Sequence, residues 1–176
     1  IASAGADSSV RIWTARDGGL AGTAAPLSTS QRCCAFFPDG GSLLTGGWDG
    51  VSRIFRVPDA TLLRTLHGHT STVTCCTVSR DGSLLVTGSN DHTVRLWDIR
   101  RDGAYAVLRD FRTEVGAVTL SPDETLLAAG SSDGRILVYR LPYGAVAGEL
   151  AVPPGRVTTL AFTPDGSILA AGFENG

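Results

Sequence analysis

Short runs of β-branched, aromatic and small apolar residues alternate with turn residues along the whole chain. The pattern is clearest from residue 71 onward, where the strand candidates are STVTCCTVS, LLVTGS, VRLWDI and AYAVLRD. RDGS and NDHT separate the first three runs, and the Asp, Asn and Gly residues in them are typical of tight turns. Apolar residues show no convincing helical spacing. The pattern therefore predicts four short strands joined by tight turns.

The same pattern returns every 42 residues without insertion or deletion. Four columns show it: Asp7, Asp49, Asp91 and Asp133; Asp39, Asp81, Asp123 and Asp165; Trp13, Phe55, Trp97 and Tyr139; Leu66, Leu108 and Leu150. One four-stranded sheet cannot bury both of its faces, whereas copies stacked around an axis cover one another. The predicted fold class is all-β, a β-propeller of four-stranded antiparallel blades.

The period also divides the chain into units. We expect the end of one blade at 1–27, three blades at 28–69, 70–111 and 112–153, and the start of another at 154–176. The chain starts inside a second-strand pattern at Ile1 to Ala4 and stops just after another at Ile168 to Gly172. About four blades form an open arc with unpaired strands and uncovered apolar faces at its two ends. We therefore expect the rest of a ring to lie outside this sequence or to come from another chain.

One unit carries a recognisable motif. Gly68-His69 precedes its first strand and Trp97-Asp98 lies in its third strand. The unit resembles a WD repeat of the β-transducin type, and turn motifs such as FPDG, SPDE and TPDG extend the resemblance along the chain. The resemblance implies a ring of usually seven blades that serves for binding, a function class it leaves broad.

The resemblance also implies a structural network of hydrogen bonds. Its members would be His69, Thr87, Asp91 and Trp97. Other repeats keep the aspartate but have Leu27 or Phe111 at the histidine position, so we expect the complete network once. A His–Thr–Asp set also suggests a catalytic triad, but the resemblance favours a clamp, and no catalytic residue is predicted.

Composition narrows the function further. The 176 residues carry a net charge of −2, and all 15 basic residues are arginine without a basic stripe, so nucleic acid is an unlikely direct partner. No apolar run reaches 18 residues, so we expect no membrane insertion. Arg11, Arg53 and Arg95 recur at the 42-residue step and either pair with nearby acids or form a basic rim for acidic peptides or phosphates.

The sequence offers few residues that could form a metal or cofactor site. The only histidines are His67, His69 and His92, with no further ligands beside them, so we predict no metal, no cofactor and no small-molecule substrate. Cys33-Cys34 and Cys75-Cys76 are adjacent pairs without metal-binding or redox spacing. We expect them to be buried free thiols in a reducing compartment, which points to an intracellular protein, cytoplasmic or alternatively nuclear.

Binding residues are expected on loops that a rigid scaffold displays. The resemblance favours the face with the turns between second and third strands and the connections between blades. The candidate residues there are Trp48, Asn90 and Ser132 in the turns, and Ser30, Thr72, Glu114 and Arg156 in the connections. Trp48 stands out because equivalent turns carry Ala, Asn or Ser; it is either a binding residue or a cover for the neighbouring loop.

The prediction for function is a non-catalytic scaffold that binds peptides or protein surfaces on this face, within a larger assembly. Its partners would be other proteins, as subunits of a multiprotein complex. Two alternatives stay open: an accessory propeller in a multidomain enzyme, and a member of an RNA-associated complex.

Overall fold

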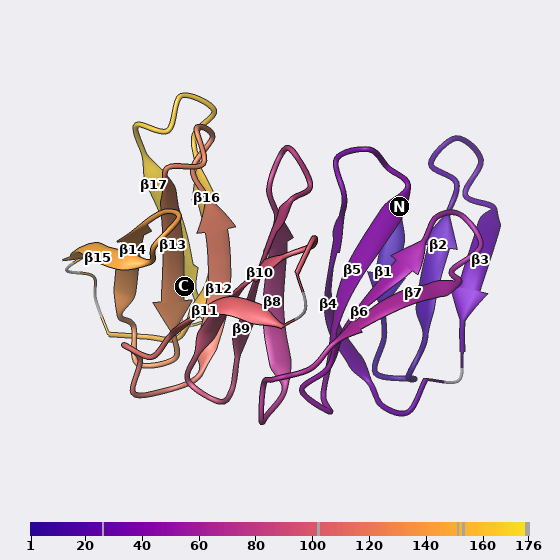
Figure 1. The fold of residues 1–176 in the computed structure, drawn as a ribbon, viewed down its shortest axis with the longest axis horizontal. Coiled ribbons are helices and arrows are strands. Elements are labelled where there is room, and N and C mark those ends of the chain that lie inside the picture. The colour runs from indigo at the N-terminus through magenta and orange to yellow at the C-terminus, as the bar shows by residue number, and fades with distance from the viewer. Residues whose placement is uncertain (26, 102, 151, 153, 175–176) are drawn as a thin grey trace.

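The chain folds into five antiparallel sheets that follow one another in sequence (Figure 1). The computed structural model describes residues 1–25, 27–101, 103–150, 152 and 154–174, so the last two residues of the predicted unit 154–176 lie outside it. The first sheet contains β1 (Ala2–Ala4), β2 (Val10–Trp13) and β3 (Leu20–Ala24). The second contains β4 (Gln31–Phe36), β5 (Ser42–Gly47), β6 (Ser52–Arg56) and β7 (Leu62–Leu66).

The remaining sheets repeat this order. The third contains β8 (Val73–Val78), β9 (Leu84–Ser89), β10 (Val94–Asp98) and β11 (Ala104–Leu108). The fourth contains β12 (Val115–Leu120), β13 (Leu126–Ser131), β14 (Ile136–Arg140) and β15 (Ala145–Leu150), and the fifth contains β16 (Val157–Phe162) and β17 (Leu169–Phe173). Within each sheet, each strand pairs with the next along the chain, which confirms the predicted all-β fold and the four-stranded antiparallel units.

Some strand ends differ from the prediction. The last strand begins at Leu169 because Ile168 belongs to the preceding turn, where its carbonyl accepts from the Thr163 amide. The predicted strand AYAVLRD ends at Leu108, where the core contacts of that strand end. Within the described ranges, no helix is long and apolar enough to cross a membrane.

The turns between first and second strands share one hydrogen bond, made by an aspartate side chain. The Oδ1 atoms of Asp39, Asp81, Asp123 and Asp165 each accept from the amide two residues later, at 2.8–3.1 Å. The residue between takes a positive φ, as at Gly40 (68°) and Glu124 (58°). These aspartates thus serve as acceptors for backbone amides inside the turns.

Neighbouring sheets meet along a seam that we call the glycine–valine seam. It consists of Gly46, Gly88 and Gly130 in second strands and Val73, Val115 and Val157 in the first strands of the following sheets. A Cβ atom on each glycine would lie 2.5–2.7 Å from the Cγ1 atom of its valine. The glycines therefore let each sheet approach the next closely, and first strands of neighbouring sheets contact one another.

The core lies between the sheets. One cluster joins Leu44, Ile54 and Leu66 of the second sheet to Leu85 and Trp97 of the third. Comparable clusters fill the spaces between the other neighbours. Stacking thus buries both faces of the inner sheets, as the repeat predicts.

Candidate functional site

A chain of buried hydrogen bonds joins the four residues of the expected network. Trp97 Nε1 donates to Thr87 Oγ1 at 2.9 Å, and Thr87 Oγ1 lies 2.8 Å from His69 Nε2. His69 Nδ1 lies 2.8 Å from Asp91 Oδ2. With the Thr87 hydroxyl proton directed to Nε2, Nδ1 carries the proton and donates to Asp91, so every group in the chain is paired.

The network's electrostatics favour a neutral histidine beside a charged aspartate. Burial lowers the pKa of His69, and this effect exceeds the opposing effect of Asp91. Although burial raises the pKa of Asp91, hydrogen bonds from Thr93 and His69 lower it to about 2. Thr87 is fully buried, so a substrate cannot reach its hydroxyl. The arrangement suits a clamp between a turn and two strands.

The neighbouring sheets replace the network with apolar contacts. Phe111 and Tyr139 occupy the His69 and Trp97 positions of the fourth sheet, with ring centroids 6.5 Å apart against 6.3 Å for the His69–Trp97 pair. In the second sheet, Leu27 packs against the cluster that contains Phe55. The complete set occurs once among the described residues, and the geometry of the ring pair persists without it.

Two of the three recurring arginines pair with nearby acids, whereas Arg95 Nε is buried without a hydrogen-bond partner among the described residues. Arg11 Nη1 lies 2.7 Å from Asp7 Oδ2, and Arg53 Nη2 lies 2.6 Å from Asp49 Oδ2. Burial lowers the pKa of Arg95, which lies near the Asp91 charge. Local pairing thus describes Arg11 and Arg53 better than the alternative of a basic rim.

The cysteines are free thiols, as expected, but they are half-buried rather than buried. Cys33 Sγ contacts the Val73 carbonyl of the next sheet, whereas Cys34 Sγ contacts the Ala2 carbonyl of the preceding one. The first strands β4, β8 and β12 each contact a neighbouring sheet on both sides, and each is the edge strand of its own sheet. Burial raises the pKa of Cys75 to about 12. The described part of the chain contains no group of His, Cys, Asp and Glu residues suited to a metal ion.

The predicted binding positions come together in pairs. Backbone amides of the turns between second and third strands donate to carbonyls of the connections, at 2.9–3.0 Å: Trp48 to Ser30, Asn90 to Thr72, Ser132 to Glu114 and Glu174 to Arg156. We call these bonds the turn ties. They hold both sets of candidate residues on one side of the sheets.

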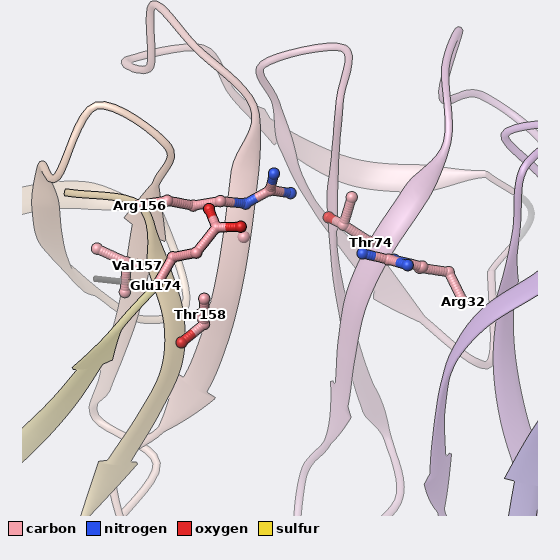
Figure 2. A pocket seen from close by; sticks show the side chains of 7 residues that line it. Arg32, Thr74, Arg156, Val157, Thr158 and Glu174 are labelled. Carbon is pink, nitrogen blue, oxygen red and sulfur yellow. The ribbon is translucent and has the colours of Figure 1, made fainter. Parts of the chain in front are cut away.

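Four of the seven candidates line a hollow on this side. Trp48, Thr72, Asn90 and Arg156 surround it together with Arg32 and Thr74. A second hollow, shown in Figure 2, shares Arg32, Thr74 and Arg156 with the first and extends to Thr158 and Glu174. We call the two together the arginine groove.

The other three candidates line neither hollow, and their side chains have local partners. Ser132 Oγ donates to Glu114 Oε2 at 2.5 Å, and Ser30 Oγ donates to the Ala6 carbonyl at 2.8 Å. The Ser132 hydrogen bond lowers the pKa of Glu114, and the Arg156 charge adds to the effect. These residues shape the side of the groove without facing it.

Trp48 stands at the edge of the groove. The residue is 56% exposed, so more than half of its surface is free to meet a partner. Tryptophan is enriched among the residues that contribute most to protein–protein binding, so an exposed Trp48 beside a hollow is a strong candidate for such a residue.

Two groove residues were missed in the sequence. Arg32 and Thr74 belong to a further 42-residue column, Arg32, Thr74, Gly116 and Thr158, in the first strands. The column could be seen in the sequence as a repeat. It does not show which side chains of these strands face the groove.

Two family models match the chain. The model described as WD domain, G-beta repeat matches residues 26–56 and 60–98. The model described as anaphase-promoting complex subunit 4 WD40 domain matches residues 118–176. Comparison with curated proteins gives no significant sequence match. The matched repeats coincide with the stacked antiparallel sheets described above, and the chain belongs to the WD-repeat β-propeller family.

Proposed function

We propose that the protein is a non-catalytic docking platform that binds peptides or protein surfaces in the arginine groove, as part of a larger assembly. The observation that carries this proposal is the exposed Trp48 ring at the edge of a groove built from four predicted positions. The turn ties hold the groove in place, so a ligand meets a preformed surface with little ordering cost.

The chemistry of the described residues supports binding over catalysis. The one set that suggests a triad has a fully buried hydroxyl, and its histidine and aspartate bind each other. The thiol pKa values of Cys75 and Cys76 are raised, which disfavours a cysteine nucleophile at either position.

The family supports protein partners. WD40 domains generally mediate protein–protein interaction. The second matching model describes a domain from a subunit of a multi-subunit complex. We propose by this likeness that the partners are complex subunits and that the protein acts in the cytoplasm or nucleus.

The test is a selection of displayed random 12-residue peptides on the immobilised protein, followed by affinity measurements with Trp48→Ala. We expect the selected peptides to lose about tenfold or more in affinity, because hot-spot aromatics commonly contribute that much. The matched control is Tyr143→Ala, since Tyr143 is 89% exposed and lies in the β14–β15 turn, at the opposite ends of the strands. Unchanged affinity in Trp48→Ala would exclude the groove as the binding site.

A further inference from the structure

Two arginine side chains, those of Arg32 and Arg156, reach into the groove. Figure 2 shows the side chains of Arg156, just before β16, and Arg32, in β4, pointing toward one another from opposite sides of the hollow. Among the described residues, neither side chain takes part in a hydrogen bond or ion pair. Arg11 and Arg53, in contrast, each hold an aspartate. Two guanidinium groups that face one hollow repel each other unless an anion lies between them.

The acidic residues nearby compensate the two arginines unequally. Glu174 lines the same hollow beside Arg156, and the Arg156 charge acts on Glu114. No such acid lines either hollow next to Arg32 in the described part of the chain. Arg32 is therefore the stronger anchor for an anion, and Arg156 is the second.

The hydroxyl groups in the groove leave the arginines as the main donors. Thr74 Oγ1 donates to the Gly88 carbonyl at 3.0 Å, and Thr158 Oγ1 donates to the Gly172 carbonyl at 3.1 Å. An anion in the groove would thus be bound by guanidinium groups, which suit both carboxylate and phosphate geometry.

A separate observation points to a ligand with a hydrogen-bond donor. The Oδ1 atom of Asn90 is buried and has no hydrogen-bond partner, and Asn90 lines the same hollow as Arg32 and Trp48. Buried acceptors are normally paired. Because this oxygen is closed to solvent, a backbone amide of a peptide in the groove reaches it only when the Asn90 side chain turns toward the peptide, and that turn exchanges an unpaired acceptor for a paired one.

The occupant is better described as a peptide than as a nucleic acid. Single-stranded RNA would also offer anions for Arg32 and a base for the Trp48 ring. However, Glu114 and Glu174 lie near Arg156, and they oppose a repeated backbone charge while tolerating one anion between the arginines. An acidic peptide has one such charge beside apolar and amide groups.

We propose that the arginine groove recognises an extended peptide with one anionic side chain, a carboxylate or a phosphoserine, held between Arg32 and Arg156. A backbone amide of the peptide donates to Asn90, and an adjacent apolar residue covers Trp48. This inference rests on the proposed function and specifies the chemistry of the partner.

The experiment uses an array of 12-residue peptides in four matched versions, with Glu, phosphoserine, Gln or Lys at one central position between Leu and Pro. Binding is measured for the wild-type protein, Arg32→Gln, Arg32→Glu and the control Arg16→Gln, which changes an exposed arginine of the β2–β3 turn. Near-ultraviolet circular dichroism checks that each variant folds. An oligouridylate of the same length is the nucleic-acid probe.

On the wild-type protein we expect the Glu or phosphoserine version to bind about tenfold more tightly than the Gln version, as expected for a charge-assisted contact. Comparing Glu with phosphoserine separates a carboxylate ligand from a phosphorylated one. Arg32→Gln should remove the advantage, Arg32→Glu should shift preference to Lys, and Arg16→Gln should change nothing.

Two outcomes would overturn the proposal. The first is equal binding, or absence of binding, for the Glu, phosphoserine and Gln versions, and the second is tighter, strongly salt-dependent binding of the oligouridylate. Trp48→Ala separates this failure from that of the proposed function. If the Glu, phosphoserine and Gln versions bind equally but Trp48→Ala still lowers the affinity for the selected peptides, the proposed docking function is retained. Only the proposed anionic chemistry of the partner is then wrong.

Discussion

The hydroxyl of Thr87 is the centre of the buried network, and its removal should be costly. Thr87→Val keeps the shape of a fully buried side chain and deletes the acceptor of the Trp97 Nε1 proton. It also deletes the hydrogen bond to His69 Nε2. Two buried polar groups then lack partners, at about 1–3 kcal/mol each, and the added methyl group recovers part of this. We expect a loss of about 2–4 kcal/mol in the free energy of unfolding.

Thr45→Val is the matched control. Thr45 occupies the equivalent position of the second sheet and is fully buried, but among the described residues its hydroxyl makes one hydrogen bond, donated to Gln31 Oε1 at 3.0 Å. The aromatic residue of that sheet is Phe55, which needs no acceptor. The control leaves one buried group, Gln31 Oε1, without this donor and should lose about 1–2 kcal/mol after the gain from the added methyl group.

Urea unfolding followed by tryptophan fluorescence and far-ultraviolet circular dichroism measures both variants. The difference between Thr87→Val and Thr45→Val should be about 1–2 kcal/mol or more, from the extra orphaned group. If the two variants lose the same free energy, the network contributes no more than an ordinary hydrogen bond, and its role as a clamp is refuted.

Two further predictions concern pH and packing. Since the pKa of His69 is lower in the folded chain than its ordinary value, the unfolded chain takes up the proton first, and wild-type stability should fall as pH decreases from 7.5 to 5. His69→Gln should show a shallower pH dependence in the same urea titrations, and an identical slope would contradict the lowered pKa. Gly88→Ala places a methyl group against Val115 and Cys75 and should destabilise by about 1–3 kcal/mol. Gly148→Ala meets open space and should change thermal stability little; equal effects would show that the glycine–valine seam tolerates a side chain.

Much of the fold was predictable because the repeat encodes it several times over. The aspartate columns predicted the turns, and the strand LLVTGS was predicted with the bounds that β9 has. The resemblance supplied the members of the network, but their bonding followed only from the way the Thr87 hydroxyl lies between two rings.

The remainder depended on how the sheets stack. Because side chains alternate along a strand, Cys33 and Cys34 face opposite ways, whereas the hollow that Cys33 lines is formed by the first strands of several sheets together. The stacking of the sheets likewise places Arg32 on the arginine groove. A sequence shows which residues share a face, whereas the neighbour of that face is set by packing between units.

The turn ties have an evolutionary consequence. Because peptide groups make these bonds, the shape of each turn places no demand on the side chain that it carries, and Trp48, Asn90 and Ser132 occupy equivalent turns. Replacements at these positions can change what the surface recognises while the fold loses little stability. Partner choice in such a scaffold can therefore drift by single substitutions, and a laboratory selection restricted to these turn positions should yield new specificities on an unchanged framework.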